Sequence, residues 1–472
     1  MKLTKTAALV LSLFITVSAA GCSYKTDVPT PSTTANVTVE STDSNPKTQS
    51  GTEPSESEDA PETFAEKPAA DVRDNDDGKL VIWSYDPNFK KLLEKYSPVK
   101  DYEYVVVSRN EYYRRLDEAF EAGNAPDMFI CGFDHVKAYS ESDKTVTINS
   151  IGISNKACET MYDYSLRMAC DSYGNIKGLT WDLSPSAVFY QRTLAQQYLG
   201  SSDPAEVSKS FSSWAAFLTA ARKVNKESNG AVKITSGTGE IFRSYIGNRS
   251  TPWKDGDKLQ TDATVESFYE YAKTINTEKL TFGALSGSDE WKAGMRNKTV
   301  LSYWGPITLA RTEAFALDPV YFRKANPTSG DWGLVQAPES FTWGGEWIMV
   351  TSASDMKKSC ADIMTSICCV YDNLKDMMAG GMAGFANSKT VINAAKTDER
   401  YNFAWLGGQN PYTILAPVAE SINAGAADPD DARIKEIYSR TVNVYANGGF
   451  RSVKDAIATF RELLIETKIV KE

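Results

Sequence analysis

Histidine is almost missing from this chain of 472 residues, which has His135 alone. A multi-histidine metal site is therefore excluded, and a Ser-His-Asp triad would depend on that single side chain. The cysteines form no CxxC pair of the kind that holds structural zinc. The glycines form no GxGxxG, GxxxxGK[ST] or GxSxG motif. We therefore expect no metal and no cofactor, and we find no motif for nucleophilic catalysis.

Positive charge and long apolar runs are also scarce. The chain has 51 Lys and Arg against 61 Asp and Glu, a net charge of −10, whereas nucleic-acid binding needs a basic face. We therefore expect no nucleic-acid partner. The apolar run Ala7–Val17 follows Lys2 and Lys5 and is too short to span a bilayer. Residues 1–21 are accordingly predicted to be a signal peptide.

The signal ends in Ala19-Ala20-Gly21-Cys22, which resembles the bacterial lipobox. In a lipobox the cysteine becomes the lipidated N-terminus, so Cys22 is the predicted lipidation site. The sequence departs from the usual pattern at Ala19, where Leu or Val is common. An ordinary secretory signal followed by a chance cysteine is the alternative.

The segment after Cys22 is predicted to be a flexible linker covering residues 22–78. Ser23–Gly78 has six Pro, sixteen Ser or Thr, one Phe and no Trp, and carries 13 acidic against 4 basic residues. Such a segment cannot bury enough apolar surface to fold. Most of the negative charge of the chain therefore lies in this spacer.

An alternation of strands and helices begins at Lys79. Strands are predicted at Lys79–Ser84, Tyr104–Val107 and Asp127–Cys131, with helices capped by Asp86 and Asn110 between them. This order implies a parallel sheet with right-handed crossovers. Ligands of such sheets bind beyond the carboxyl ends of the strands, where Tyr85-Asp86, Ser108-Arg109 and Gly132-Phe133-Asp134 stand.

The rest of the body continues as an α/β chain with a helical end. Further strands are predicted at Ala187–Gln191, Thr299–Trp304 and Trp347–Val350. Helices are predicted at Ser212–Lys223, Ala263–Thr274, Met356–Ala379, Pro411–Ala424, Pro429–Tyr445 and Ser452–Lys468.

Tryptophan recurs near the predicted loops and strand ends. The six in question are Trp83, Trp181, Trp304, Trp343, Trp347 and Trp405. Flat rings beside carboxylates suit reversible sugar binding, because the ring covers the C–H face while the carboxylate accepts from hydroxyls. Asp86, Asp134, Asp182 and Glu346 could instead supply the two carboxyl groups of a glycosidase, which lie roughly 5 or 6.5–9.5 Å apart.

An ordered set of segments carries a family resemblance. These segments are KLVIWSYDPNF, APDMFICGFDHV, GNIKGLTWDLSPSAVFYQRTL, KTVLSYWGPI, FTWGGEWIMV and FAWLGGQNPY. From Lys79 to Lys468 the chain resembles the extracellular solute-binding proteins of bacterial carbohydrate ABC transporters, the family that includes maltose-binding protein. The resemblance implies an α/β fold of periplasmic-binding-protein type II. It has two lobes, each a mainly parallel sheet flanked by helices, joined by a hinge.

The resemblance also implies lobe boundaries and site residues. Residues 79–186 and 291–340 would form the N-terminal lobe, and residues 187–290 and 341–472 the C-terminal lobe. The implied ligand-binding residues are Tyr85, Asp86, Gly132, Asp134, Trp181, Asp182, Trp304, Gly305, Trp343, Gly344, Gly345, Glu346, Gly408 and Gln409. The turn at Gly407-Gly408-Gln409 has an equal alternative as a simple helix start.

The stretch Phe341–Val350, FTWGGEWIMV, concentrates these expectations. Trp343 is the predicted stacking platform, and its glycine neighbours would let a ligand approach the backbone. Trp347 is ambiguous, because strand alternation could turn it into the core. Glu346 departs from the family pattern, which usually has a small residue there.

The expected function is that of a lipid-anchored receptor on the extracellular face of the cell membrane. It would bind a carbohydrate, in the form of an oligosaccharide, and deliver it to ABC transporter permease subunits, acting as a monomer and not as an enzyme. The alternatives are a surface glycosidase and a carbohydrate adhesion protein. Among the remaining cysteines, Cys158–Cys170 is the one disulfide worth testing in an exported chain.

Overall fold

The computed structural model describes residues 64–75, 78–247, 249–312, 315–317, 324 and 326–471. The predicted signal peptide, Cys22 and most of the predicted linker lie outside these residues. One compact unit, Glu66–Glu472, holds every strand and helix given below.

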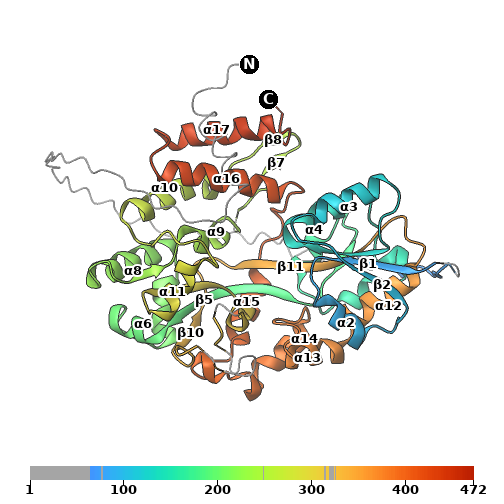
Figure 1. The fold of residues 1–472 in the computed structure, drawn as a ribbon, viewed down its shortest axis with the longest axis horizontal. Helices are drawn as coiled ribbons and strands as arrows, with labels where there is room; N and C mark the ends of the chain where they lie inside the picture. The colour runs from blue at the N-terminus through green and yellow to red at the C-terminus, as the bar shows by residue number, and fades with distance from the viewer. Residues whose placement is uncertain are drawn as a thin grey trace, which may run out of the picture. The chain divides into compact units, whose positions relative to one another are not determined.

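The first half-sheet is formed by three parallel strands (Figure 1). They are β1 (Leu80–Ser84), β2 (Tyr102–Val106) and β3 (Met128–Gly132), with β1 in the middle. Helices α2 (Phe89–Tyr96) and α3 (Tyr112–Glu121) connect them. The strand–helix–strand–helix–strand order predicted from the sequence is therefore confirmed.

Both connecting helices start later than the predicted caps. The carboxylate of Asp86 accepts from the backbone N of Asn88 at 2.9 Å, which closes a turn before α2 begins at Phe89. The N-cap of α3 is Glu111 rather than Asn110. Aspartate and asparagine serve turns and caps through the same short-range hydrogen bonds, so the sequence alone does not separate the two roles.

The second half-sheet is built around β5 (Leu183–Gln191). β9 (Val300–Pro306) and β10 (Trp332–Val335) pair with β5 in antiparallel orientation, and β6 (Lys233–Thr235) pairs with β9 in parallel. This half-sheet therefore contains both orientations, whereas the first is parallel up to β3.

A single long strand, β11 (Phe341–Val350), belongs to both half-sheets. Glu346–Val350 pairs with β3, while Phe341–Gly345 pairs with the start of β5, with a register shift between Thr342 and Gly345. In Figure 1, β11 and β5 run between the two halves. The stretch FTWGGEWIMV is thus the crossing strand itself.

These pairings differ from the lobe boundaries expected from the sequence. β9 and β10 lie within residues 291–340 but pair with β5 in the second half-sheet. Glu346–Val350 lies within residues 341–472 but pairs with β3 in the first half-sheet. An apolar run predicts that a strand is buried; its partner is chosen by long-range pairing, which no local signal encodes.

The remaining elements surround these strands. The longer helices are α4 (Phe133–Ser140), α8 (Trp214–Glu227), α9 (Thr238–Gly247), α10 (Ala263–Thr277), α11 (Asp289–Arg296), α12 (Lys357–Cys368), α13 (Tyr371–Ala379), α14 (Lys389–Lys396), α15 (Tyr412–Ser421), α16 (Asp431–Ala446) and α17 (Val453–Glu466). The short elements are β4 (Gly178–Leu179), β7 (Lys254–Asp255), β8 (Lys258–Leu259), α5 (Asp163–Met168), α6 (Arg192–Tyr198), α7 (Pro204–Ser208) and the 3-10 turns Asn149–Ile151, Asn155–Cys158, Lys209–Phe211, Ile307–Arg311, Glu399–Tyr401 and Ala404–Leu406.

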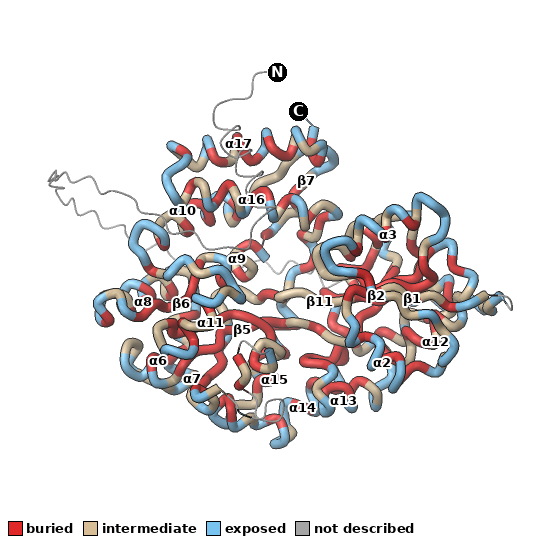
Figure 2. Tube along the Cα trace, in the orientation of Figure 1, coloured by how far each residue is buried: buried red, intermediate tan, exposed pale blue. Residues whose placement is uncertain are grey.

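The helices fall into two groups, one packed beside each half-sheet. α12 packs against α2 beside the first half-sheet, whereas α16 packs against α10 and α17, and α9 packs on β11 and β9. Figure 2 shows the buried stretch along β5 between these layers. The helix predicted as Met356–Ala379 is two helices, α12 and α13, separated at Cys369-Val370.

The ordered body begins earlier than Lys79. The backbone carbonyl of Lys67 accepts from Asn149 Nδ2 at 3.1 Å. Asp74 accepts from the backbone N of Lys358 at 2.7 Å and from the hydroxyl of Ser359 at 2.6 Å. Asp74 therefore satisfies free N–H groups at the start of α12. The predicted linker, residues 22–78, thus ends in a segment that is fixed to the fold.

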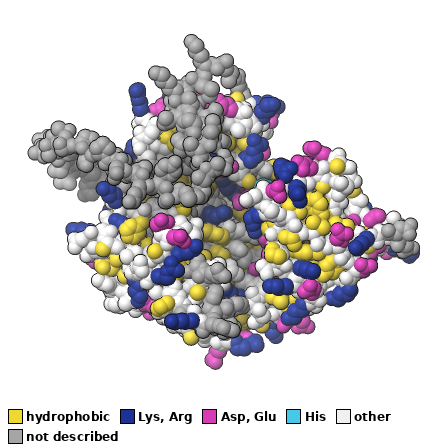
Figure 3. Space-filling model, viewed as in Figure 1, with side chains coloured by type: hydrophobic (Ala, Val, Ile, Leu, Met, Phe, Trp, Pro, Cys, Tyr) yellow, Lys and Arg dark blue, Asp and Glu magenta, His cyan; other side chains and the backbone are white. Residues whose placement is uncertain are grey.

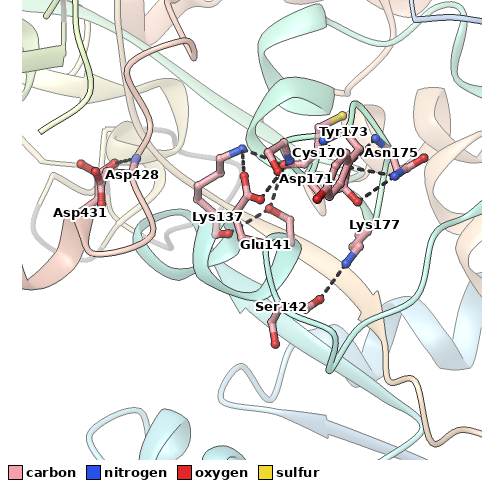
Figure 4. A network of polar contacts seen from close by, with 12 residues as sticks. Lys137, Glu141, Ser142, Cys170, Asp171, Tyr173, Asn175, Lys177, Asp428 and Asp431 are labelled. Atoms are coloured by element: carbon pink, nitrogen blue, oxygen red, sulfur yellow. Dashed lines mark hydrogen bonds and ion pairs between the residues drawn. The ribbon is translucent and has the colours of Figure 1, made fainter. Parts of the chain in front are cut away.

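The disulfide Cys158–Cys170 is absent, because both thiols are free. Cys170 lies in a polar network in which its carbonyl accepts from Lys137 Nζ at 2.8 Å (Figure 4). Cys158 instead has the Cys369 thiol as its neighbour, and this contact together with burial raises the pKa of Cys158. No signal in the sequence places Cys158 beside Cys369.

Candidate functional site

A cleft of about 1110 Å³ opens where the two half-sheets meet. Its lining comes from the ends of β1 and β3, from the middle of β11, and from helices α9 and α16. Beyond the carboxyl ends of parallel strands is the expected position for a ligand. Figure 3 shows basic and acidic side chains interspersed over the face in view.

The first wall of the cleft is a group of tyrosines around Gly132. The backbone N of Gly132 donates to Tyr113 Oη at 2.8 Å. A Cβ at this position would lie 2.9 Å from Tyr85 Oη and 3.1 Å from Tyr113 Oη. Glycine at this position therefore leaves room for the hydroxyl groups of the two tyrosines.

Glu346 stands beside this group, because β11 pairs it with Gly132. Its side chain is 24% exposed, and Oε1 lies 3.7 Å from Arg109 Nη2. Burial, with the nearby charge of Asp86, raises the pKa of Glu346 to about 7. Arg109 in turn lies over the ring of Tyr85, 4.1 Å from its centroid. Glu346, the residue that departs from the family pattern, thus points into the cleft.

The floor of the cleft is formed at Trp181 and Asp182. Trp181 is buried against Phe89, with ring centroids 5.2 Å apart. The carboxylate of Asp182 accepts from the backbone N of Gly384 at 2.9 Å and of Phe385 at 2.8 Å. Burial nevertheless raises the pKa of Asp182 to about 6. Asp182 therefore fixes a distant loop while it faces the cleft.

The crossing strand resolves the roles of its two tryptophans. Trp347 is fully buried and its Nε1 donates to the carbonyl of Ser165 at 2.9 Å, so it is core. Gly345 has φ +154°, and a Cβ there would lie 2.9 Å from the Trp347 ring. Trp343 is partly exposed on the cleft side, and a Cβ at Gly344 would meet nothing within 4 Å.

An ion-pair cluster joins the two walls. Asp134 on α4 lies 3.4 Å from Lys435 on α16, and Lys435 also lies 3.4 Å from Asp431. Asp431 in turn lies 3.3 Å from the buried Arg249. Although burial acts to raise it, the pKa of Asp134 is lowered, because Lys435 and Arg243 are close.

Nine of the predicted site residues line the cleft. These are Tyr85, Gly132, Asp134, Trp181, Asp182, Trp343, Gly344, Gly345 and Glu346. All of them lie at or near strand ends or belong to the crossing strand, and all were implied by the family resemblance.

Five predicted residues lie elsewhere. Asp86 closes the turn before α2. Trp304 is buried in β9 and stacks on Trp214 at 6.0 Å, and at Gly305 a Cβ would lie 2.9 Å from Leu309. Both follow from the placement of β9 in the interior of the second half-sheet.

The Gly408-Gln409 turn is also structural. Gly408 has φ +84°, a left-handed conformation that favours glycine. Gln409 accepts from the backbone N of Leu334 at 2.8 Å and from Arg192 at 2.9 Å, so it ties β10 to α6. The alternative given by the sequence, a turn that leads into a helix, agrees with the start of α15 at Tyr412.

Several lining residues were not predicted. They include Arg109, Tyr113, His135, Phe242, Arg243 and Lys435. Arg109 stands at a strand end that the sequence did indicate. Tyr113 stacks on His135, with centroids 3.5 Å apart, and burial lowers the pKa of His135. Arg243 and Lys435 project from helix faces, and their amphipathic pattern gives no hint of which polar positions face a cleft.

The fold and the cleft define a two-lobed α/β binding protein, in which a crossing strand and opposing walls surround a solute-sized cavity. The chain belongs to the bacterial extracellular solute-binding proteins: the model of that family matches residues 91–424. Among curated protein sequences, no match was found. The family assigned by resemblance from the sequence is thus confirmed.

Solved structures support the fold. A crystal structure described as extracellular solute-binding protein family 1 aligns with a TM-score of 0.70 at 16% identity, covering 83% of this chain and 99% of that one. The galacto-N-biose-/lacto-N-biose I-binding protein of an ABC transporter from Bifidobacterium longum, in complex with lacto-N-biose, aligns with a TM-score of 0.63 at 14% identity, covering 84% and 100%.

A third structural relative is the ABC transporter associated binding protein from B. animalis subsp. lactis in complex with beta-1,6-galactobiose. It aligns with a TM-score of 0.60 at 19% identity, covering 83% of this chain and 99% of that one. At these identities the alignments establish the two-lobed fold.

Two features are absent from the described residues. In that part of the chain, no helix combines the length and apolar character that crossing a membrane requires. The same residues contain no group of three or more His, Cys, Asp or Glu side chains placed to hold a metal ion.

Proposed function

We propose that the protein is a lipid-anchored extracellular receptor that captures an oligosaccharide in the cleft and delivers it to an ABC importer. The observation that carries the proposal is the crossing strand, where Trp343 and Glu346 face the same cleft as Tyr85 and Asp182. Rings for the C–H faces of a sugar and carboxylates for its hydroxyls thus converge on one cavity. The complexes of the structural relatives with galactobiose and lacto-N-biose agree with this assignment.

Capture requires that the two walls close on the ligand and later release it. The cleft is shared between the half-sheets, and β5 and β11 are the strands that pass between them. A ligand that touches both walls binds the closed arrangement better and shifts the population toward it. The ion pair of Asp134 with Lys435 spans the walls and stabilises the same arrangement.

The ligand test is a titration with a panel of mono- and oligosaccharides, followed by intrinsic tryptophan fluorescence and by thermal shift. Trp343 reports from the cleft, and Tyr173→Ala is a suitable control because Tyr173 is 86% exposed and lies outside the cleft lining. At least one sugar should change the fluorescence and raise the melting temperature. No response to any carbohydrate would refute the proposal.

The anchor is tested by fractionation. Cys22→Ala should move the protein from the membrane fraction to the medium, while an intact Cys22 retains it and incorporates labelled fatty acid. Size-exclusion chromatography with light scattering should give the monomer mass. Secretion of the unchanged protein without lipid would contradict the anchored form but leave ligand binding intact.

A glycosidase remains the second candidate, because the pKa of Glu346 is raised to about 7 and that of Asp182 to about 6 in the same cleft. A general acid needs such a raised pKa. However, Asp182 already accepts two backbone N–H groups, which assigns it a structural task. Product formation from oligosaccharides over hours would favour the enzyme; a stable complex with the intact sugar favours the receptor.

If the protein is instead an adhesion protein, the walls of the cleft should not close on a soluble ligand. Small-angle scattering with and without a bound sugar separates the two. A decrease in the scattering radius favours the receptor, and an unchanged radius at saturating ligand favours adhesion.

A further inference from the structure

Most carboxylates of the cleft already have an ion-pair or hydrogen-bond partner in the protein. Asp134 pairs with Lys435 at 3.4 Å, and Asp431 pairs with Arg249 at 3.3 Å. The carboxylate of Asp182 is held by backbone N–H groups. The remaining carboxylate that α16 contributes to the lining, Glu436, pairs with Arg440.

Among the described residues, two arginines of the lining form no hydrogen bond with a carboxylate. Arg109 is 71% exposed, and its nearest carboxylate oxygen is that of Glu346 at 3.7 Å, beyond hydrogen-bond distance. Arg243 is near enough to Asp134 to help lower the pKa of that carboxyl group, but no carboxylate of the described residues lies within 4.0 Å of its guanidinium, which is 5.3 Å from the centroid of the Trp343 ring. The protonated fraction of Glu346 near neutral pH weakens the one nearby countercharge further.

The two arginines share an arrangement on opposite walls. Arg109 follows β2 and lies over Tyr85 at 4.1 Å, whereas Arg243 projects from α9 beside Trp343. A guanidinium that lies over a ring is held in place by that ring, and the N–H groups at its edge stay available. Each guanidinium therefore presents a fork of N–H donors to the cleft, which suits a sugar that carries a planar anion.

On this basis, and resting on the proposed function, we infer that the ligand is an acidic oligosaccharide containing a uronic acid, whose carboxylate binds Arg109 or Arg243. Both guanidinium groups keep N–H donors that no carboxylate of the described residues engages at hydrogen-bond distance. A planar carboxylate can accept from two such donors of one guanidinium at once. Glu346 would accept from a hydroxyl of the adjoining residue.

Calorimetric titration of the full folded protein tests the inference with matched ligands. The probes are di-, tri- and tetrasaccharides of galacturonic and glucuronic acid, and the same oligosaccharides after reduction of the carboxyl group to the alcohol. The acidic form should bind at least 10-fold more tightly than its reduced counterpart. Its affinity should fall as NaCl rises, while that of the neutral form stays unchanged.

Variants locate the contact. Arg109→Gln or Arg243→Gln should weaken binding of the acidic sugar at least 10-fold and that of the reduced sugar less than 3-fold. Arg114→Gln is the control, because Arg114 is 58% exposed on α3 and lies outside the cleft lining. The melting temperature of each variant checks that the fold is retained.

The possible outcomes separate this inference from the proposed function. Equal or tighter binding of the neutral sugar, with no effect of either arginine variant, overturns the acidic ligand and leaves carbohydrate capture standing. Preference for an amino sugar or a sulfated sugar also overturns it. If neither acidic nor neutral saccharides bind, both the inference and the proposed function fail.

Discussion

The two walls of the cleft are made in different ways. The first wall consists of residues that follow three consecutive strands, Tyr85 after β1, Arg109 after β2 and Asp134 after β3, all within 50 positions of one another. The second wall takes Arg243 from α9 and Lys435 from α16, which lie almost 200 positions apart. The first wall is therefore a property of local sequence order, and the second is a property of helix packing.

The crossing strand β11 contains the same contrast within ten residues. Its second half, Glu346–Val350, is anchored against β3 and buries Trp347, whereas its first half presents Trp343 to the cleft. The glycines between them serve the core as much as the ligand, since Gly345 makes room for the ring of Trp347. One short stretch thus divides into a structural half and a binding half.

The largest expected effect tests that division through stability. Trp347→Ala removes a fully buried ring with a hydrogen-bonded Nε1, so we expect a loss of about 3–5 kcal/mol in the free energy of unfolding. Trp343→Ala, the matched change on the exposed half, should cost about 1 kcal/mol. Urea denaturation followed by circular dichroism measures both. Equal losses for the two variants would abolish the distinction.

The next effect concerns binding. Trp343→Ala should weaken the affinity for the sugar found in the titration panel by about 2 kcal/mol, close to 30-fold, as for a buried aromatic anchor. Tyr173→Ala should leave the affinity unchanged. Calorimetry is the measurement. An unchanged affinity of Trp343→Ala would remove the stacking role from the crossing strand and leave it to the first wall.

A third effect is pH-dependent and concerns Glu346 in the first wall. Because the pKa of Glu346 is raised from 4.5 to about 7, the native state holds the proton more tightly than the unfolded state. This contribution to stability is complete below pH 4.5 and is lost as the pH rises through 7. Glu346→Gln should therefore gain about 1–3 kcal/mol relative to the parent between pH 4 and pH 8.

Melting temperatures across this pH range give the comparison for Glu346→Gln. The control is Glu111→Gln, at the exposed N-cap of α3 and outside the cleft lining. The same pH dependence in Glu346→Gln and in the parent would show that the carboxyl group ionises normally in the fold.

The smallest effect should come from the ion pair between the walls. Lys435→Gln removes the 3.4 Å contact with Asp134, where both side chains are partly exposed, so we expect a loss of about 1 kcal/mol in ligand affinity. Scattering of the ligand-free variant should show a larger radius than the parent. Lys223→Gln, on α8 with its partner Glu227 outside the cleft, is the control. A smaller scattering radius for Lys435→Gln than for the parent would show that the ion pair holds the two walls apart instead of together.

Much of the first half-sheet and of the first wall could be predicted. Period-two apolar runs and helical spacing gave β1, β2 and β3 with their helices, and the rule that ligands bind beyond strand ends gave Tyr85 and Asp134. The failures were of another kind. Trp304 was chosen as a strand-end ring, but β9 lies between β5 and β6, so its side chains face the core.

The sequence by itself determined the strands and helices of the first half-sheet, the α/β class and the family, because these depend on periodicity, on turn chemistry and on an ordered set of segments. Only the tertiary structure decided which strands pair, that Gly132 leaves room for two tyrosines, and that Arg243 and Lys435 reach the cleft. Pairing and helix orientation arise from contacts between residues far apart in the chain, and such contacts leave no local pattern. The second wall, which bears on the identity of the ligand, therefore became visible only in the folded chain.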